Sequence, residues 1–118
     1  MSLEPEPQAA EAAPQPPARL LLVDDEPGLR TAVQAYLEDE GFQVTTAVDG
    51  EDGWAKAQEL LPDVVISDVM MPRLDGYGLL RKLRDDERLG GTPVIFLTAK
   101  GMTADRISGF QAGADDYI

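Results

Sequence analysis

The sequence predicts an α/β fold, with a mainly parallel sheet and helices on both of its faces. Short apolar runs alternate with stretches whose apolar residues recur at helical spacing, in the order βαβαβαβαβ. The runs at 20–23 and 94–97 are apolar throughout, which is typical of parallel strands buried on both faces. Parallel strands joined through helices need right-handed crossovers, and these crossovers place the helices against the sheet.

The first part of the chain predicts two strands with a helix between them. We expect strands over 19–24 and 42–48, because the first segment is largely apolar and the second is rich in Val and Thr. Pro27 suits the first turn of a helix, and Gly41 suits its end. Apolar residues keep helical spacing between these two positions: Leu29, Val33, Tyr36 and Leu37.

A second helix is expected after Asp49. The pair Asp49-Gly50 could also form a hairpin turn. However, apolar residues follow at i, i+3 and i+7: Trp54, which we expect in the core, Ala57 and Leu61. We therefore interpret Asp49 as the N-cap and Asp52 as residue N3, with Pro62 ending the helix.

The remaining elements continue the alternation. We expect a strand at 63–67, a helix marked by three leucines and broken by Gly90-Gly91, and a strand at 93–97. The three leucines are Leu79, Leu80 and Leu83. A shorter helix at 103–111 and the start of a fifth strand at 116–118 complete the pattern.

Composition limits what the chain can do. A chain of 118 residues allows one domain with a modest core. Without cysteine or histidine it has no disulfide, no thiol or imidazole metal site and no Ser-His pair. The net charge of −12 disfavours binding of nucleic acid by this segment, and no apolar run approaches a membrane span. Residues 1–17 are rich in Pro and Ala, so we expect a disordered tail before a domain at 18–118.

Three predicted strands end on residues suited to phosphate chemistry: Asp24-Asp25, Asp68 and Thr98. The carboxyl ends of parallel strands share one edge of a sheet, where such folds bind ligands. Carboxylates about 4 Å apart repel each other by on the order of 4 kcal/mol per pair at an effective dielectric constant near 20. A divalent cation relieves this repulsion, and a small set of oxygen ligands suits Mg²⁺. A carboxylate can also attack phosphorus, so we expect a cation-dependent phosphoryl-accepting site.

The chain also resembles the receiver domain of two-component response regulators, over about residues 19–118. The resemblance is carried by the segments 21–26, 66–72, 94–99 and 113–117 together with Asp75-Gly76. It implies a flavodoxin-like, doubly wound parallel sheet of five strands in the order 2-1-3-4-5, within three α/β/α layers. It also implies a signalling role: the domain accepts a phosphoryl group from a sensor histidine kinase or phosphotransfer protein and switches an output domain.

The resemblance assigns a role to each candidate residue. Asp68 resembles the phosphoacceptor. Asp25 would bind Mg²⁺ directly, and Asp24 would bind it through a water molecule. The main-chain carbonyl of Met70 would be the last of the protein ligands. Two further roles are implied: Thr98 as the switch hydroxyl and Tyr117 as the switch aromatic.

The chain departs from the family pattern at its end. Family members carry a Lys and a Pro shortly after the position of Tyr117, whereas this sequence stops at Ile118. Lys100 is interpreted as a solvated surface charge. We therefore expect a truncated receiver domain without its last helix, taken from a longer cytoplasmic regulator whose output domain binds DNA, with a homodimer as a possible state.

Other interpretations stay open. Asp25 or Glu26 could cap the first helix, Thr98 could be an ordinary strand residue, and Tyr117 could be a sheet aromatic. A Mg²⁺-dependent phosphohydrolase would need a general acid two residues after its nucleophile, where this chain has Met70, and a cap for its substrate. A receiver-shaped interaction module that never takes up phosphate is the remaining alternative. As a receiver domain, the protein is expected to catalyse only its own phosphorylation and dephosphorylation on an aspartate, and not to be an enzyme otherwise.

Overall fold

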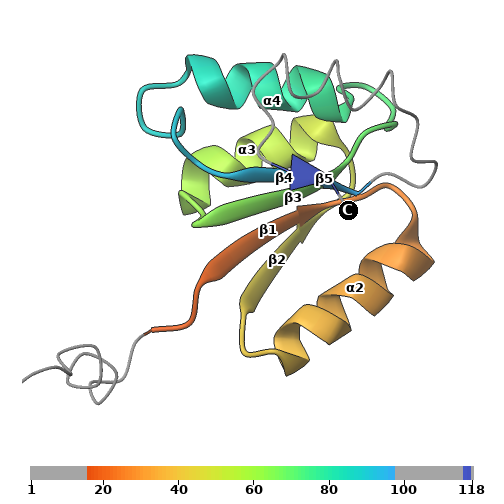
Figure 1. Cartoon of the computed structure of the whole chain (residues 1–118). Coiled ribbons are helices and arrows are strands. Elements are labelled where there is room, and N and C mark those ends of the chain that lie inside the picture. The colour runs from red at the N-terminus through yellow and green to blue at the C-terminus, as the bar shows by residue number, and fades with distance from the viewer. Residues whose placement is uncertain (1–15, 98–115, 118) are drawn as a thin grey trace, which may run out of the picture.

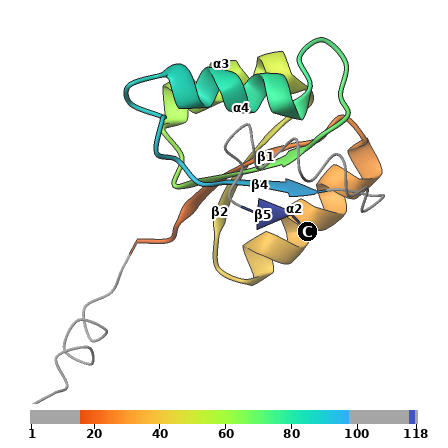
Figure 2. The ribbon, with the colours of Figure 1, turned by 45° about the horizontal axis from the view of Figure 1, so that its top comes forward.

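The computed structural model describes residues 16–97 and 116–117, which form a five-stranded parallel sheet in the order β2-β1-β3-β4-β5 (Figure 1). The strands are β1 (Arg19–Val23), β2 (Gln43–Ala47), β3 (Val64–Asp68), β4 (Val94–Leu97) and β5 (Asp116–Tyr117). The described helices are α2 (Pro27–Asp39), α3 (Gly50–Leu60) and α4 (Gly76–Asp85). Helix α2 covers one face of the sheet, and α3 and α4 cover the other (Figures 1 and 2). The predicted fold class and strand order are confirmed.

Each face of the sheet has its own hydrophobic cluster, because successive strand residues point to opposite sides. The cluster under α3 and α4 is the larger and includes Leu21, Val23, Val65 and Phe96. The cluster under α2 consists of Leu20, Leu22 and Ile66, with half-buried residues around it. Trp54, expected in the core, lies half-buried at the edge of the larger cluster.

Short-range capping explains where the helices begin. The Glu26 carboxylate accepts a hydrogen bond from Leu29 N at 2.6 Å, so Glu26 rather than Asp25 caps α2. Asp49 caps α3, as predicted, by accepting from the backbone N–H of residue N3, Asp52, at 2.8 Å. In each case a carboxylate satisfies one of the N–H groups that the first turn leaves without a helical partner.

Two helix ends differ from the expectation. Helix α4 ends at Asp85, before the glycine pair, because the Asp86 side chain accepts from the N–H groups of Arg88 and Leu89 and folds the chain into a turn. Leu61, counted on the apolar face of α3, is instead its left-handed C-cap residue with φ 49° and is 39% exposed.

Helix α2 packs less deeply than its spacing indicated. None of its residues is fully buried, and Leu29 and Tyr36 are exposed. Val33 and Leu37 make the contact with the sheet. No helix in the described part of the chain is long and apolar enough to cross a membrane. The expected tail, apart from residues 16 and 17, and the expected helix at 103–111 lie outside the described residues.

Candidate functional site

Three aspartates converge at the carboxyl ends of two neighbouring strands. Asp24 and Asp25 directly follow β1, and Asp68 is the last residue of β3. The parallel register pairs Val23 with Ser67, so the two strand ends lie side by side. One carboxylate oxygen of each aspartate lies within 4.8 Å of the others. The structure therefore brings together the three carboxylates that the sequence predicted would meet.

Asp24 is fully buried and holds the loop after β1 in place. Its Oδ1 accepts a hydrogen bond from Glu26 N at 2.9 Å, and its main-chain carbonyl accepts one from the Arg30 guanidinium at 2.8 Å. Its own N–H donates to the carbonyl of Ala47 at 3.1 Å, which ties the loop to β2. Its Oδ2 is buried and has no hydrogen-bond partner among the described residues. A buried carboxylate oxygen without a partner is costly, and it indicates a ligand or water at this point.

Asp68 faces the same space from β3 and is half-buried. Its Oδ1 accepts from Val69 N at 2.8 Å, so the first amide of the following loop orients the carboxylate. Gly76 N donates to the Val69 carbonyl at 2.8 Å and closes this loop. A Cβ at position 76 would overlap the main-chain oxygen of Asp68, so only glycine lets α4 begin this close to β3.

The pKa values of Asp24 and Asp68 are both raised. Burial is the main cause at each carboxyl, since it disfavours the charged form. The charges of Asp25 and Glu26 raise the pKa of Asp24 further, while the N–H of Glu26 and the charge of Arg30 lower it. The charges of Asp24 and Asp25 also raise the pKa of Asp68, against the hydrogen bonds from Val69 and Met70 N–H.

These residues fit a hard divalent cation. One oxygen of Asp24 and one of Asp68 lie no more than 4.8 Å apart, so at an effective dielectric constant near 20 two charged carboxylates there would repel by about 3.5 kcal/mol or more. The donors are all oxygens, and the unpartnered Asp24 Oδ2 can accept from a water that the cation would hold. Met70 follows Asp68 by two residues and is 76% exposed; its main-chain carbonyl stays a predicted ligand.

We expect Asp24→Asn to stabilise the cation-free protein by about 1 kcal/mol or more, on the usual scale of single substitutions. The new amide keeps the Oδ1 acceptor for Glu26 N and replaces the unpartnered Oδ2 by a donor that can face Asp68. Chemical denaturation in EDTA at neutral pH measures the difference in unfolding free energy. Asp63→Asn, at the opposite end of β3, is the control and should change little.

The raised pKa values also fix the sign of the pH dependence. As the pH falls from neutral through the raised folded-state values, the folded protein binds protons before the unfolded chain does, so the unfolding free energy should rise. The advantage of Asp24→Asn over wild type should therefore shrink as the pH approaches the unfolded-state value of about 3.9. An advantage that stays constant or grows over this range would contradict the assignment.

Several predicted site residues lie outside the described part of the chain. Thr98 belongs to the segment 98–115, and of Tyr117 only the backbone in β5 is described. Lys100, interpreted as a surface charge, lies in the same segment as Thr98. Their predicted roles are therefore untested. Arg30 contacts the site but was not predicted. The sequence did contain an indication of this contact. A positive charge in the first turn of a helix is unfavourable beside the helix dipole, so a partner such as the Asp24 carbonyl is expected for Arg30.

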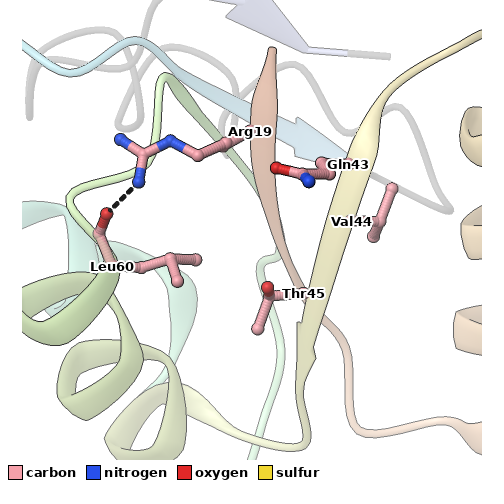
Figure 3. A pocket seen from close by; sticks show the side chains of 5 residues that line it. All are labelled: Arg19, Gln43, Val44, Thr45 and Leu60. Atoms are coloured by element: carbon pink, nitrogen blue, oxygen red, sulfur yellow. Dashed lines mark hydrogen bonds between the residues drawn. The ribbon is translucent and has the colours of Figure 1, made fainter. Parts of the chain in front are cut away.

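A small pocket elsewhere is unrelated to this chemistry (Figure 3). It lies at the amino ends of β1 and β2 and is lined by Arg19, Gln43, Val44, Thr45 and Leu60. The Arg19 guanidinium donates to the carbonyls of Leu60 and Leu61 at 2.7 and 2.6 Å and so caps the end of α3. Arg19 therefore has a structural role at the end of α3, and no ligand is needed to explain its position.

The structure thus combines a doubly wound parallel sheet with an acidic cluster at the carboxyl ends of β1 and β3. The sequence profile described as the response regulator receiver domain matches residues 20–118. The chain belongs to this family. It is a family of receiver domains and not of enzymes in the usual sense.

Relatives and solved structures agree with this assignment. The chain is 55% identical over 103 residues to response regulator Rre1 of Synechocystis, covering 86% of this chain and 45% of that relative. It is 45% identical over 100 residues to the DNA-binding dual master transcriptional regulator RpaA of Synechocystis, covering 85% of this chain and 42% of RpaA. The chain thus spans less than half the length of these relatives.

One similar solved structure also contains a metal ion at its active site. The receiver domain of sensor histidine kinase PA1611 from Pseudomonas aeruginosa is 35% identical, with a TM-score of 0.80, over 86% of this chain and 84% of that one. That receiver domain has a magnesium ion coordinated in its active-site cleft.

Proposed function

We propose that the domain, at residues 18–118, accepts a phosphoryl group on Asp68 in a Mg²⁺-dependent reaction and thereby switches an output domain. The observation that carries the proposal is the convergence of the carboxylates of Asp24, Asp25 and Asp68 at one edge of the sheet. The buried, unpartnered oxygen of Asp24 supports a cation at this edge. The PA1611 receiver domain, with magnesium in its cleft, supports the same choice of metal.

The transfer requires one bond to form and one to break. A carboxylate oxygen of Asp68 attacks the phosphorus of a phosphohistidine, the P–N bond breaks, and the imidazole leaves with the electron pair and takes up a proton. The Val69 N–H holds the attacking carboxylate at the end of β3. Asp25, Asp68 and the Met70 carbonyl would hold Mg²⁺, with Asp24 acting through water. The cation would supply the neutralisation of charge on the phosphoryl oxygens.

The remaining roles follow from the family and stay predictions. Thr98 would turn its hydroxyl toward the phosphoryl group, and the Tyr117 ring would follow. The donor would be a sensor histidine kinase or a phosphotransfer protein in the cytoplasm. Because relatives such as RpaA are named DNA-binding regulators, we propose transcriptional control as the output of the full-length protein. Homodimer formation is part of the same proposal.

Incubation with acetyl phosphate and Mg²⁺ tests the proposal. We expect one phosphoryl group per chain, lost in base or hydroxylamine, because an acyl phosphate is labile to both. Peptide mapping should place it on Asp68. A label that survives both treatments, as on serine or threonine, would contradict the mechanism. The two alternatives differ in result: a phosphohydrolase would turn over phosphomonoesters, and an inert interaction module would take up no label.

A further inference from the structure

The loop after Asp68 is anchored to a helix that contributes no residue to the acidic cluster. This loop, residues 69–75, carries the Val69 N–H that orients Asp68 and the carbonyl of Met70. Arg73, near its end, donates from Nη1 to Oδ2 of Asp49 at 3.2 Å, and the two form an ion pair. Asp49 is the N-cap residue of α3, so the pair joins the loop to the start of that helix.

The burial and hydrogen bonding of Asp49 favour an ion pair with this arginine. Its residue exposure is only 8%, and its Oδ1 is already engaged by Asp52 N at 2.8 Å. The second oxygen, Oδ2, is therefore available for Arg73. A buried carboxylate that lacked this second partner would be disfavoured, so the pair satisfies Asp49 as well as anchoring the loop.

The backbone conformation of the loop also depends on its contact with α3. Arg73 has φ 70°, a left-handed conformation that a residue with a side chain adopts at a cost, so a tertiary contact must hold it there. The next residue, Leu74, packs so closely on α3 that a Cβ at position 50 would overlap its main-chain oxygen. The loop is thus held against α3 by both a charged and a close-packed contact.

We infer that the Asp49–Arg73 pair is a positioning device for the phosphorylation site. By holding the loop against α3, it keeps the Met70 carbonyl and the Val69 N–H in place beside Asp68. Neither Asp49 nor Arg73 would touch the cation or the phosphoryl group. The inference rests on the proposed function, because the quantities it controls are Mg²⁺ affinity and the rate of phosphorylation at Asp68.

The experiment is a double-mutant cycle on Mg²⁺ binding, followed through the amide NMR shifts of residues 24, 25 and 68–70. Arg73→Met removes the charge, and Asp49→Asn keeps the Oδ1 cap but removes the charge of its partner. Each single variant should weaken Mg²⁺ binding by about threefold to tenfold, and the double variant should be no worse than either. Arg73→Lys should recover part of the affinity, since it restores the charge without the guanidinium geometry.

Arg88→Met is the matched control. Arg88 is also an exposed arginine beside an aspartate, Asp86 at 3.8 Å, but it lies in the turn after α4. This variant should leave Mg²⁺ affinity unchanged. Denaturant unfolding of all variants separates positioning from stability, because a merely structural pair would lower the unfolding free energy and leave the dissociation constant as in wild type.

Two results would overturn the inference. If wild type binds Mg²⁺ and both single variants bind it equally well, the pair does not position the site, and the proposed function stands. If wild type neither binds Mg²⁺ nor takes up phosphate, the proposed function fails and the inference fails with it.

Discussion

Asp68→Asn should lose all detectable phosphoryl transfer from acetyl phosphate, a reduction of at least about 100-fold in the labelling rate. The amide keeps the shape of the side chain and an oxygen that can accept from Val69 N, but it is a poor nucleophile toward phosphorus. A 100-fold reduction corresponds to about 2.7 kcal/mol in the activation free energy. Mass spectrometry of the intact chain measures the labelled fraction over time.

Folding must be held constant in this comparison. Asp63→Asn is the matched control, because Asp63 lies just before β3, at the amino end of the strand that ends in Asp68. The exchange there keeps an oxygen that can accept from Arg19 N. The control should be labelled like wild type. Persistence of the base-labile label in Asp68→Asn would show that another carboxylate is the acceptor.

Removal of Mg²⁺ should also slow labelling, by a smaller factor. With EDTA, or in Asp25→Asn, we expect the labelling rate to fall by at least about tenfold. Without the cation, the negative phosphoryl oxygens would be repelled by the carboxylates of the acidic cluster. Asp25 is exposed and does not cap α2, so its replacement should leave the fold intact. Titration with Mg²⁺, followed through amide shifts of residues 24, 25 and 68–70, measures the accompanying loss of affinity.

Mn²⁺ adds a direct test of location. This paramagnetic ion should broaden the amide signals of the same residues in wild type at concentrations that leave Asp25→Asn unaffected. Signals near Asp63 should stay sharp in both proteins. Broadening around some other group of acidic residues, in a chain with a net charge of −12, would place the cation elsewhere.

The parts of the structure that follow from helix capping or from the parallel strand topology were predictable from the sequence. Asp49 caps α3 as expected, because a cap depends on a carboxylate and an N–H three residues apart. The meeting of Asp24 and Asp68 was also predictable, since parallel strands that begin at one edge of a sheet end together at the other. The cap follows from a local rule, and the meeting of the two carboxylates follows from the parallel topology of the sheet.

Contacts that depend on how two loops meet were not predictable. Arg73 and Asp49 are 24 residues apart, and nothing in either segment alone indicates the other. Leu61 shows the limit of periodicity: its spacing fits the apolar face of α3, but the helix ends one residue earlier and turns that side chain outward. The end of α4 was missed because the Asp86 side chain takes the N–H groups that could have extended the turn.

The parallel register of β1 and β3 also has a kinetic consequence. The two strands are separated in the chain by α2, β2 and α3, so their pairing is a non-local event with a large loop-closure entropy. The same event forces the carboxylates of Asp24 and Asp68 together. Chain entropy and charge repulsion therefore oppose the same step of folding, and a cation that binds there would act on the folding pathway as well as on the finished site.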